Sequence, residues 1–143
     1  MNFNETRDLF LEEAQELLAK IENALLQLEK RPDDRELVNE VFRALHTIKG
    51  SGGMFGFTHV SEFTHLVENL FDEVRKGKLK ISPAIIDVGL RSADCIAGLL
   101  DNPEGSAEQQ RIIMDIERIG KAEAGRSPDS GQAASDSDTG ANE

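Results

Sequence analysis

Apolar residues recur at steps of three and four residues through five successive segments, and this spacing restricts the fold more than any other feature of the chain. The pattern is clearest between Leu9 and Leu28, and Pro32 closes it. Such steps place apolar side chains on one face of an α-helix. No segment alternates apolar and polar residues for long enough to predict a β-strand. The sequence therefore predicts an all-α fold.

Capping and breaking residues predict where the helices begin and end. The expected starts lie at Asp33 with Glu36, Thr58, Ser82 before Pro83, and Ser106 with Gln109. The expected ends lie at Pro32, Ser51–Gly53, Gly77 and Asn102–Pro103. Because the connections are short, neighbouring helices should be antiparallel. We expect an up-and-down antiparallel four-helix bundle with an additional C-terminal helix.

The length of the chain and the composition of its last segment predict one domain and a tail. A chain of 143 residues is the size of a single domain. After Gly125 it has no Leu, Ile, Val or Phe, so it cannot bury enough apolar surface to offset chain entropy. We expect a helical-bundle domain at 1–122 and a disordered linker at 123–143. A linker at the end suggests the first module of a larger protein.

Charge and hydropathy limit the partners. The net charge of −11 disfavours binding to nucleic acid and to anionic membrane surfaces. The sequence has neither an apolar run that could insert into a membrane nor a signal-peptide pattern, so we expect a cytoplasmic location and protein partners. The single Cys95 cannot form an internal disulfide, and its surroundings favour the role of a small core residue.

The most informative local feature is a histidine followed by a lysine and a run of small residues. His46 lies at the edge of an apolar helical stripe, so its imidazole should be partly exposed. Neutral imidazole is a nucleophile near neutral pH. Lys49, one turn later, could offset the charge of an incoming phosphoryl group. Gly50 and Gly53 would leave steric clearance beside the ring.

Four stretches carry a resemblance to a known family. They are His46-Thr47-Ile48-Lys49-Gly50, Met54–Phe57, Thr64–Leu70 and Asp72–Gly77. In this order the segments resemble histidine phosphotransfer (HPt) domains, and more narrowly the N-terminal (P1) domain of chemotaxis histidine kinases of the CheA type. The resemblance runs from about Phe10 to about Leu100 and implies the same helical bundle.

The resemblance assigns roles to a small polar cluster. It implies that His46 is the phosphorylated nucleophile and that the Glu68 carboxylate hydrogen-bonds Nδ1, so that Nε2 attacks the γ-phosphate of ATP. His65 and Lys49 match the other members of this cluster. We expect Glu68 to lie outside the apolar core.

Three other residues receive no role in the phosphoryl chemistry. His59 has no motif support and should lie on the surface. Phe55 and Phe57 should anchor the loop against the bundle.

The family also implies the partners. His46 would accept a phosphoryl group from ATP held by a separate kinase catalytic domain and pass it to an aspartate of response-regulator receiver domains of the CheY and CheB type. The chain has no nucleotide-binding signature, so ATP and Mg²⁺ should bind to the partner and this domain should need no cofactor. The domain would be the substrate within a parent protein-histidine kinase, monomeric by itself, and brought to chemoreceptor arrays by other modules.

Three alternatives remain. A free-standing HPt phosphorelay protein would share the motif. A carboxylate-bridged metal bundle is suggested by Glu62 and His65, which have the Glu-x-x-His spacing, but no second copy of that spacing appears and Arg43 lies near His46. A purely structural helical adaptor is equally disfavoured by the motif.

Overall fold

The computed structural model describes residues 2–102 and 104–125, and this part of the chain forms five helices and no strands. They are α1 (Phe3–Lys30), α2 (Arg35–Met54), α3 (Thr58–Arg75), α4 (Pro83–Asp101) and α5 (Ala107–Gly125). The prediction of an all-α fold is confirmed. Helix α5 continues past the expected boundary at 122, and residues 126–143 of the expected linker lie outside the described residues.

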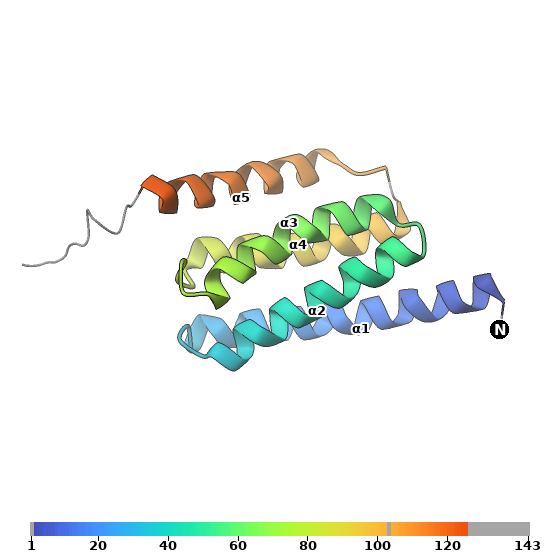
Figure 1. The fold of residues 1–143 in the computed structure, drawn as a ribbon, viewed down its shortest axis with the longest axis horizontal. Helices are drawn as coiled ribbons and strands as arrows, with labels where there is room; N and C mark the ends of the chain where they lie inside the picture. Colours follow the sequence, from blue (N-terminus) through green and yellow to red (C-terminus); the bar gives the residue numbers. More distant parts are fainter. Residues whose placement is uncertain (1, 103, 126–143) are drawn as a thin grey trace, which may run out of the picture.

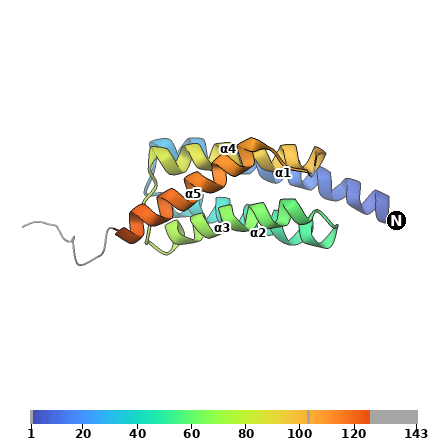
Figure 2. The same ribbon diagram turned by 90° about the horizontal axis from the view of Figure 1, so that it is seen from above.

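Helices α1 to α4 form the antiparallel four-helix bundle that the sequence predicts, and α5 is the additional helix (Figure 1). α2 packs between α1 and α3, and α4 closes the bundle against α1 and α3. α5 lies along α3 and α4, on the side away from α1 and α2 (Figure 2). None of the helices in the described ranges has the length and apolar content needed to span a membrane.

The helix starts agree with the predicted caps at two positions and differ at two. Ser82 Oγ accepts the backbone N–H of Ile85 at 3.2 Å, and Ser106 Oγ accepts that of Gln109 at 3.3 Å, as expected. The cap of α2 is Asp34 rather than Asp33, because the Asp34 carboxylate is the one that reaches the first free N–H groups of the helix.

The α2–α3 connection is the part of the fold that the sequence predicted least well. α2 does not stop at Ser51–Gly53 but continues to Met54, and the chain turns at Gly56, whose φ is +82°. The glycines permit close helix packing instead: a Cβ on Gly52 would lie 3.5 Å from Val60. Thr58 is the first helical residue of α3 and not its cap, since Phe57 precedes the helix without a side-chain hydrogen bond.

Aliphatic and aromatic side chains from all five helices form one core. Its largest fully buried members are Phe63, Phe71, Ile21, Leu25, Leu28, Leu45, Ile48, Ile96, Ile112, Val41, Val60 and Val67. Phe55 and Phe57 anchor the α2–α3 loop, as predicted, because both rings pack against Phe10, with centroids 5.5 and 5.4 Å from its own. Cys95 is half-buried against the core, and burial raises the pKa of its thiol to about 11.

Candidate functional site

The candidate site is a polar seam between two antiparallel helices. Each helix presents residues at i, i+4 and i+7, which share one face. They are Phe42, His46 and Lys49 on α2, and Glu68, Asp72 and Arg75 on α3. Since the helices run in opposite directions, Phe42 meets Arg75 at one end of the seam and Lys49 meets Glu68 at the other.

Glu68 is the centre of this seam. Its Oε2 lies 2.6 Å from Nδ1 of His46, and its Oε1 lies 2.7 Å from Nζ of Lys49. His65, one turn earlier on α3, is farther away, with Nδ1 3.6 Å from Oε1. The structure thus brings together the four polar residues that the sequence singled out, with His65 at the edge of the cluster.

The burial of Glu68 differs from the expectation. We expected this residue outside the core, but it is only 4% exposed, because it sits where α3 packs against α2. Burial opposes ionisation of the carboxylate, while hydrogen bonds and charge attraction from Lys49 and His46 favour it more strongly, and the pKa of Glu68 is lowered from its ordinary value of 4.5. Glu68 is therefore an anion held in place by two cationic or hydrogen-donating groups.

The ring of His46 is held at one nitrogen and open at the other. In the neutral imidazole the carboxylate accepts a hydrogen bond from Nδ1–H, which leaves the lone pair on Nε2. Among the described residues Nε2 has no hydrogen-bond partner, and the His46 side chain is 64% exposed. The predicted partial exposure is confirmed. The arrangement leaves the second ring nitrogen unpaired on an exposed side chain.

The two glycines near His46 have different surroundings. A Cβ on Gly50 would meet no atom within 4 Å, so packing does not require glycine there and the space beside the helix is open. A Cβ on Gly53 would lie 3.4 Å from Ser61 Oγ, so Gly53 allows α2 and α3 to approach each other. Ser61 also donates a hydrogen bond to the Lys49 carbonyl at 3.1 Å.

The seam also contains residues to which the sequence gave no role in the site. The ring of Phe42 lies nearly parallel to that of His46, with centroids 6.2 Å apart and planes inclined by 18°. The guanidinium carbon of Arg75 lies 4.3 Å from the Phe42 centroid, and Asp72 binds Arg75 through Nε at 3.1 Å. Phe42 reads as a core residue in the sequence, and its spacing of four from His46 was the available signal.

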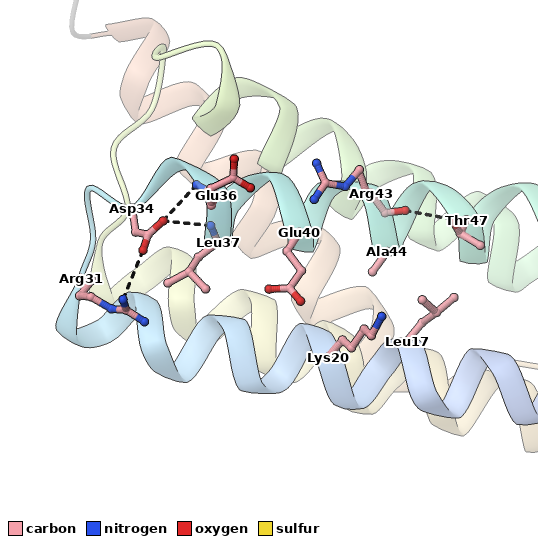
Figure 3. A pocket seen from close by; sticks show the side chains of 10 residues that line it. All are labelled: Leu17, Lys20, Arg31, Asp34, Glu36, Leu37, Glu40, Arg43, Ala44 and Thr47. Atoms are coloured by element: carbon pink, nitrogen blue, oxygen red, sulfur yellow. Dashed lines mark hydrogen bonds and ion pairs between the residues drawn. The ribbon is translucent and has the colours of Figure 1, made fainter.

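A groove of about 550 Å³ runs between α1 and α2, beside the helix that carries His46 (Figure 3). Arg43 and Thr47 line it, and the Thr47 hydroxyl donates to the Arg43 carbonyl at 3.1 Å. Lys20 of α1 and Glu40 of α2 also point into it. The lining combines charged side chains with the apolar side chains of Leu17, Leu37 and Ala44.

Residues 2–102 and 104–125 contain no group of three or more His, Cys, Asp or Glu side chains arranged to hold a metal ion. Glu62 and His65, on which the hypothesis of a metal site rested, are both exposed on α3. His59 lies on the surface, as predicted.

Comparisons with known proteins agree with this geometry. The family model for the Hpt domain matches residues 5–121. The chemotaxis protein CheA of Salmonella typhimurium is 43% identical over 108 residues, which is 76% of this chain and 16% of that protein. CheA of Bacillus subtilis is 32% identical over 116 residues, covering 81% of this chain and 17% of that protein. The chain thus spans about a sixth of the length of these relatives.

Solved structures give the same result. A histidine phosphotransfer domain of CheA superposes with a TM-score of 0.71 at 33% identity, over 82% of this chain and 91% of the other. The CheA phosphotransferase domain of Thermotoga maritima gives 0.66 at 37% identity, over 72% and 97%. The phosphorylated P1 domain of CheA3 from R. sphaeroides, solved with CheY6, gives 0.71 at 26% identity, over 80% and 98%. With a family match over most of its length, the chain belongs to the Hpt domain family.

Proposed function

We propose that this domain is the phosphohistidine carrier of a CheA-type chemotaxis kinase. The observation that carries the proposal is the contact of 2.6 Å between Nδ1 of the exposed His46 and the buried Glu68 carboxylate. It gives the ring the tautomer that a nucleophilic Nε2 needs. Because the relatives are CheA proteins, a carrier within a larger kinase is favoured over a free-standing phosphorelay protein.

In the first step, the Nε2 lone pair of His46 attacks the γ-phosphorus of ATP bound to a separate kinase catalytic domain. The Nε2–P bond forms, the bond from phosphorus to the bridging oxygen breaks, and ADP leaves with that electron pair. The ring gains positive charge, which the Glu68 carboxylate stabilises through the Nδ1 proton. Lys49 shares its ammonium protons between Glu68 and the phosphoryl oxygens. The open space at Gly50 gives the kinase domain and its bound ATP access to the ring.

In the second step, a carboxylate oxygen of a receiver-domain aspartate attacks the same phosphorus. The P–N bond breaks and its electron pair returns to Nε2, which restores the neutral ring. A receiver domain as acceptor is supported by the R. sphaeroides structure, in which a P1 domain is paired with CheY6. ATP and Mg²⁺ belong to the kinase domain in this proposal. The cytoplasmic face of a chemoreceptor array is the location it implies.

The test is phosphorylation in trans. Incubation with ATP and a CheA-type catalytic domain is expected to give an acid-labile, base-stable phosphoprotein, and His46→Gln is expected to abolish it. His59→Gln is the matched control, because His59 is an exposed histidine outside the seam, and it should label like the parent. Labelling that survives His46→Gln would refute the assignment.

A further inference from the structure

We propose that Phe42, held by Arg75, sets the plane of the His46 ring and so aims Nε2 at the phosphoryl group. Phe42 is then a positioning residue for phosphoryl transfer. The inference rests on the proposed function of His46 and adds a second point of control over the nucleophile, besides Glu68.

One hydrogen bond does not fix an imidazole. The contact between Nδ1 and Glu68 locates one atom of the ring, but the ring can still swing about that bond, and Nε2 moves with it. The His46 side chain is 64% exposed, so the packing of the core does not stop this motion. A contact against the ring face is needed to fix the plane.

Phe42 supplies that contact from one helical turn earlier. Its ring is nearly parallel to the imidazole, with a centroid separation of 6.2 Å and an interplanar angle of 18°. This geometry lies within the range of offset stacking, about 4.5 to 7 Å between centroids. The phenyl ring therefore lies beside the imidazole in a nearly parallel orientation, where it limits the swing of the ring, and the exposed remainder of the imidazole is open to a partner.

Phe42 is itself fixed from α3. The Arg75 guanidinium lies over its ring at 4.3 Å, a distance at which a cation is attracted to an aromatic face. Arg75 is bound by Asp72 through two of its nitrogens, and Asp72 also contacts Lys76 Nζ at 2.9 Å. These contacts thus connect α3 to His46 through Asp72, Arg75 and Phe42, independently of Glu68.

The experiment compares Phe42→Leu, Phe42→Tyr and Phe57→Leu. Phe57→Leu is the matched control, because Phe57 is also half-buried and also lies beneath an arginine, with Arg7 6.0 Å from its centroid. Two quantities are measured on each variant. One is the NMR chemical shift of the carbon-bound His46 ring protons in the unphosphorylated chain, at both plateaus of the His46 titration, and the other is the rate of trans-phosphorylation.

Phe42→Leu removes the ring current and the flat support, so we expect the His46 proton shifts to move and the rate to fall about 10-fold, since small misplacements of a reacting atom cost up to about 100-fold. Phe42→Tyr should restore both, and Phe57→Leu should change neither. A rate unchanged in Phe42→Leu, or a Tyr variant as slow as the Leu variant, would overturn the proposal.

Arg75→Gln is a second test that keeps the bundle core intact. It should move the same His46 proton shifts in the same direction and slow phosphorylation by about two- to fivefold, in line with the loss of one cation–π contact. A slower rate with unchanged shifts would mean that Arg75 contacts the partner, and would overturn its positioning role. Because the shifts need no phosphorylation, they separate failure of this inference from failure of the carrier function, which His46→Gln tests.

Discussion

At the scale of the residue, Glu68 is the group on which the site depends. A buried carboxylate without partners would be protonated, or would destabilise the fold. Here Lys49 and His46 keep it charged, with contacts of 2.7 and 2.6 Å. In the proposed mechanism the same pairing also activates His46, because it holds the proton on Nδ1 and leaves the Nε2 lone pair free. Under this proposal, stability and reactivity depend on the same side chain.

Glu68→Gln tests this double role. The amide keeps the shape but removes the charge, so phosphorylation of His46 should slow by about 10- to 1000-fold. Because Glu68 is buried, the free energy of unfolding should also fall, by about 1 to 3 kcal/mol. Urea unfolding and labelling rates measure the two effects. Glu62→Gln, an exposed carboxylate on the same helix, is the control and should change neither.

The lowered pKa of Glu68 predicts a dependence on pH. The folded pKa lies below the ordinary 4.5, so the ionised carboxylate contributes stability above 4.5, and this contribution is lost as the pH falls through the folded value. The stability difference between the parent and Glu68→Gln should therefore be largest at about pH 7 and should shrink at about pH 3. A difference that stays constant between the two would show that the charge of Glu68 does not stabilise the fold.

At the scale of the element, α5 is attached by one arginine and a short apolar face. Arg91 of α4 binds Glu108 at 3.0 Å and Asp115 at 2.8 Å, both on α5. The guanidinium lowers the pKa of both carboxyls. Ile112 is fully buried beneath this network. In the described part of the chain α5 packs on α3 and α4 and makes no packing contact with α2, so its attachment does not involve the helix that carries His46.

Arg91→Gln should loosen α5 without changing the seam. We expect α5 to open more readily, because the ion pairs of Arg91 with Glu108 and Asp115 are lost. Amide exchange of α5 should therefore rise, while that of α2 and α3 stays the same. The rate of His46 phosphorylation should not change. Arg111→Gln is the control, since Arg111 pairs with Glu108 inside α5. Equal amide exchange of α5 in Arg91→Gln and Arg111→Gln would contradict the anchoring role of Arg91.

At the scale of the whole molecule, α4 closes the bundle by packing closely against α1 and α3, the two helices on which α2 packs. Gly89 of α4 makes this approach possible: a Cβ there would lie 2.9 Å from Leu25 Cδ1 and 3.1 Å from Phe71 Cζ. Both neighbours are fully buried, so a Cβ at this position would require packed core side chains to shift. The site depends on this packing only indirectly, because the packing supports the register of α3 against α2.

Two alanine variants on α4 test the packing. Gly89→Ala should destabilise the bundle by about 1 to 3 kcal/mol, the usual cost of overpacking. Gly98→Ala should stabilise it by about 0.5 to 1 kcal/mol, because a Cβ on Gly98 meets nothing within 4 Å and alanine favours the helix. Urea unfolding measures both. Equal effects of the two substitutions would contradict the close approach at Gly89.

The helices could be predicted from the sequence because each carries its own apolar period. The caps at Ser82 and Ser106 could also be predicted, because the capping residue and the N–H group that it binds are close in the sequence. Asp33 and Asp34 are adjacent and equally able to cap, so the choice needed the backbone conformation. The burial of Glu68 and the contact between Phe42 and Arg75 depend on the register of α3 against α2, which no local pattern encodes. The role of Glu68 came from the family resemblance, and the structure adds its distances.

The position of the phosphoryl group on the His46 ring tests the central claim most directly. Nitrogen-15 NMR of the phosphorylated domain, with labelled histidine, distinguishes phosphorus on Nε2 from phosphorus on Nδ1. Since Glu68 occupies Nδ1 at 2.6 Å and leaves Nε2 open, we predict a phosphorus–nitrogen coupling to Nε2 of His46 alone. Coupling to Nδ1, or phosphorus on another residue, would contradict the account.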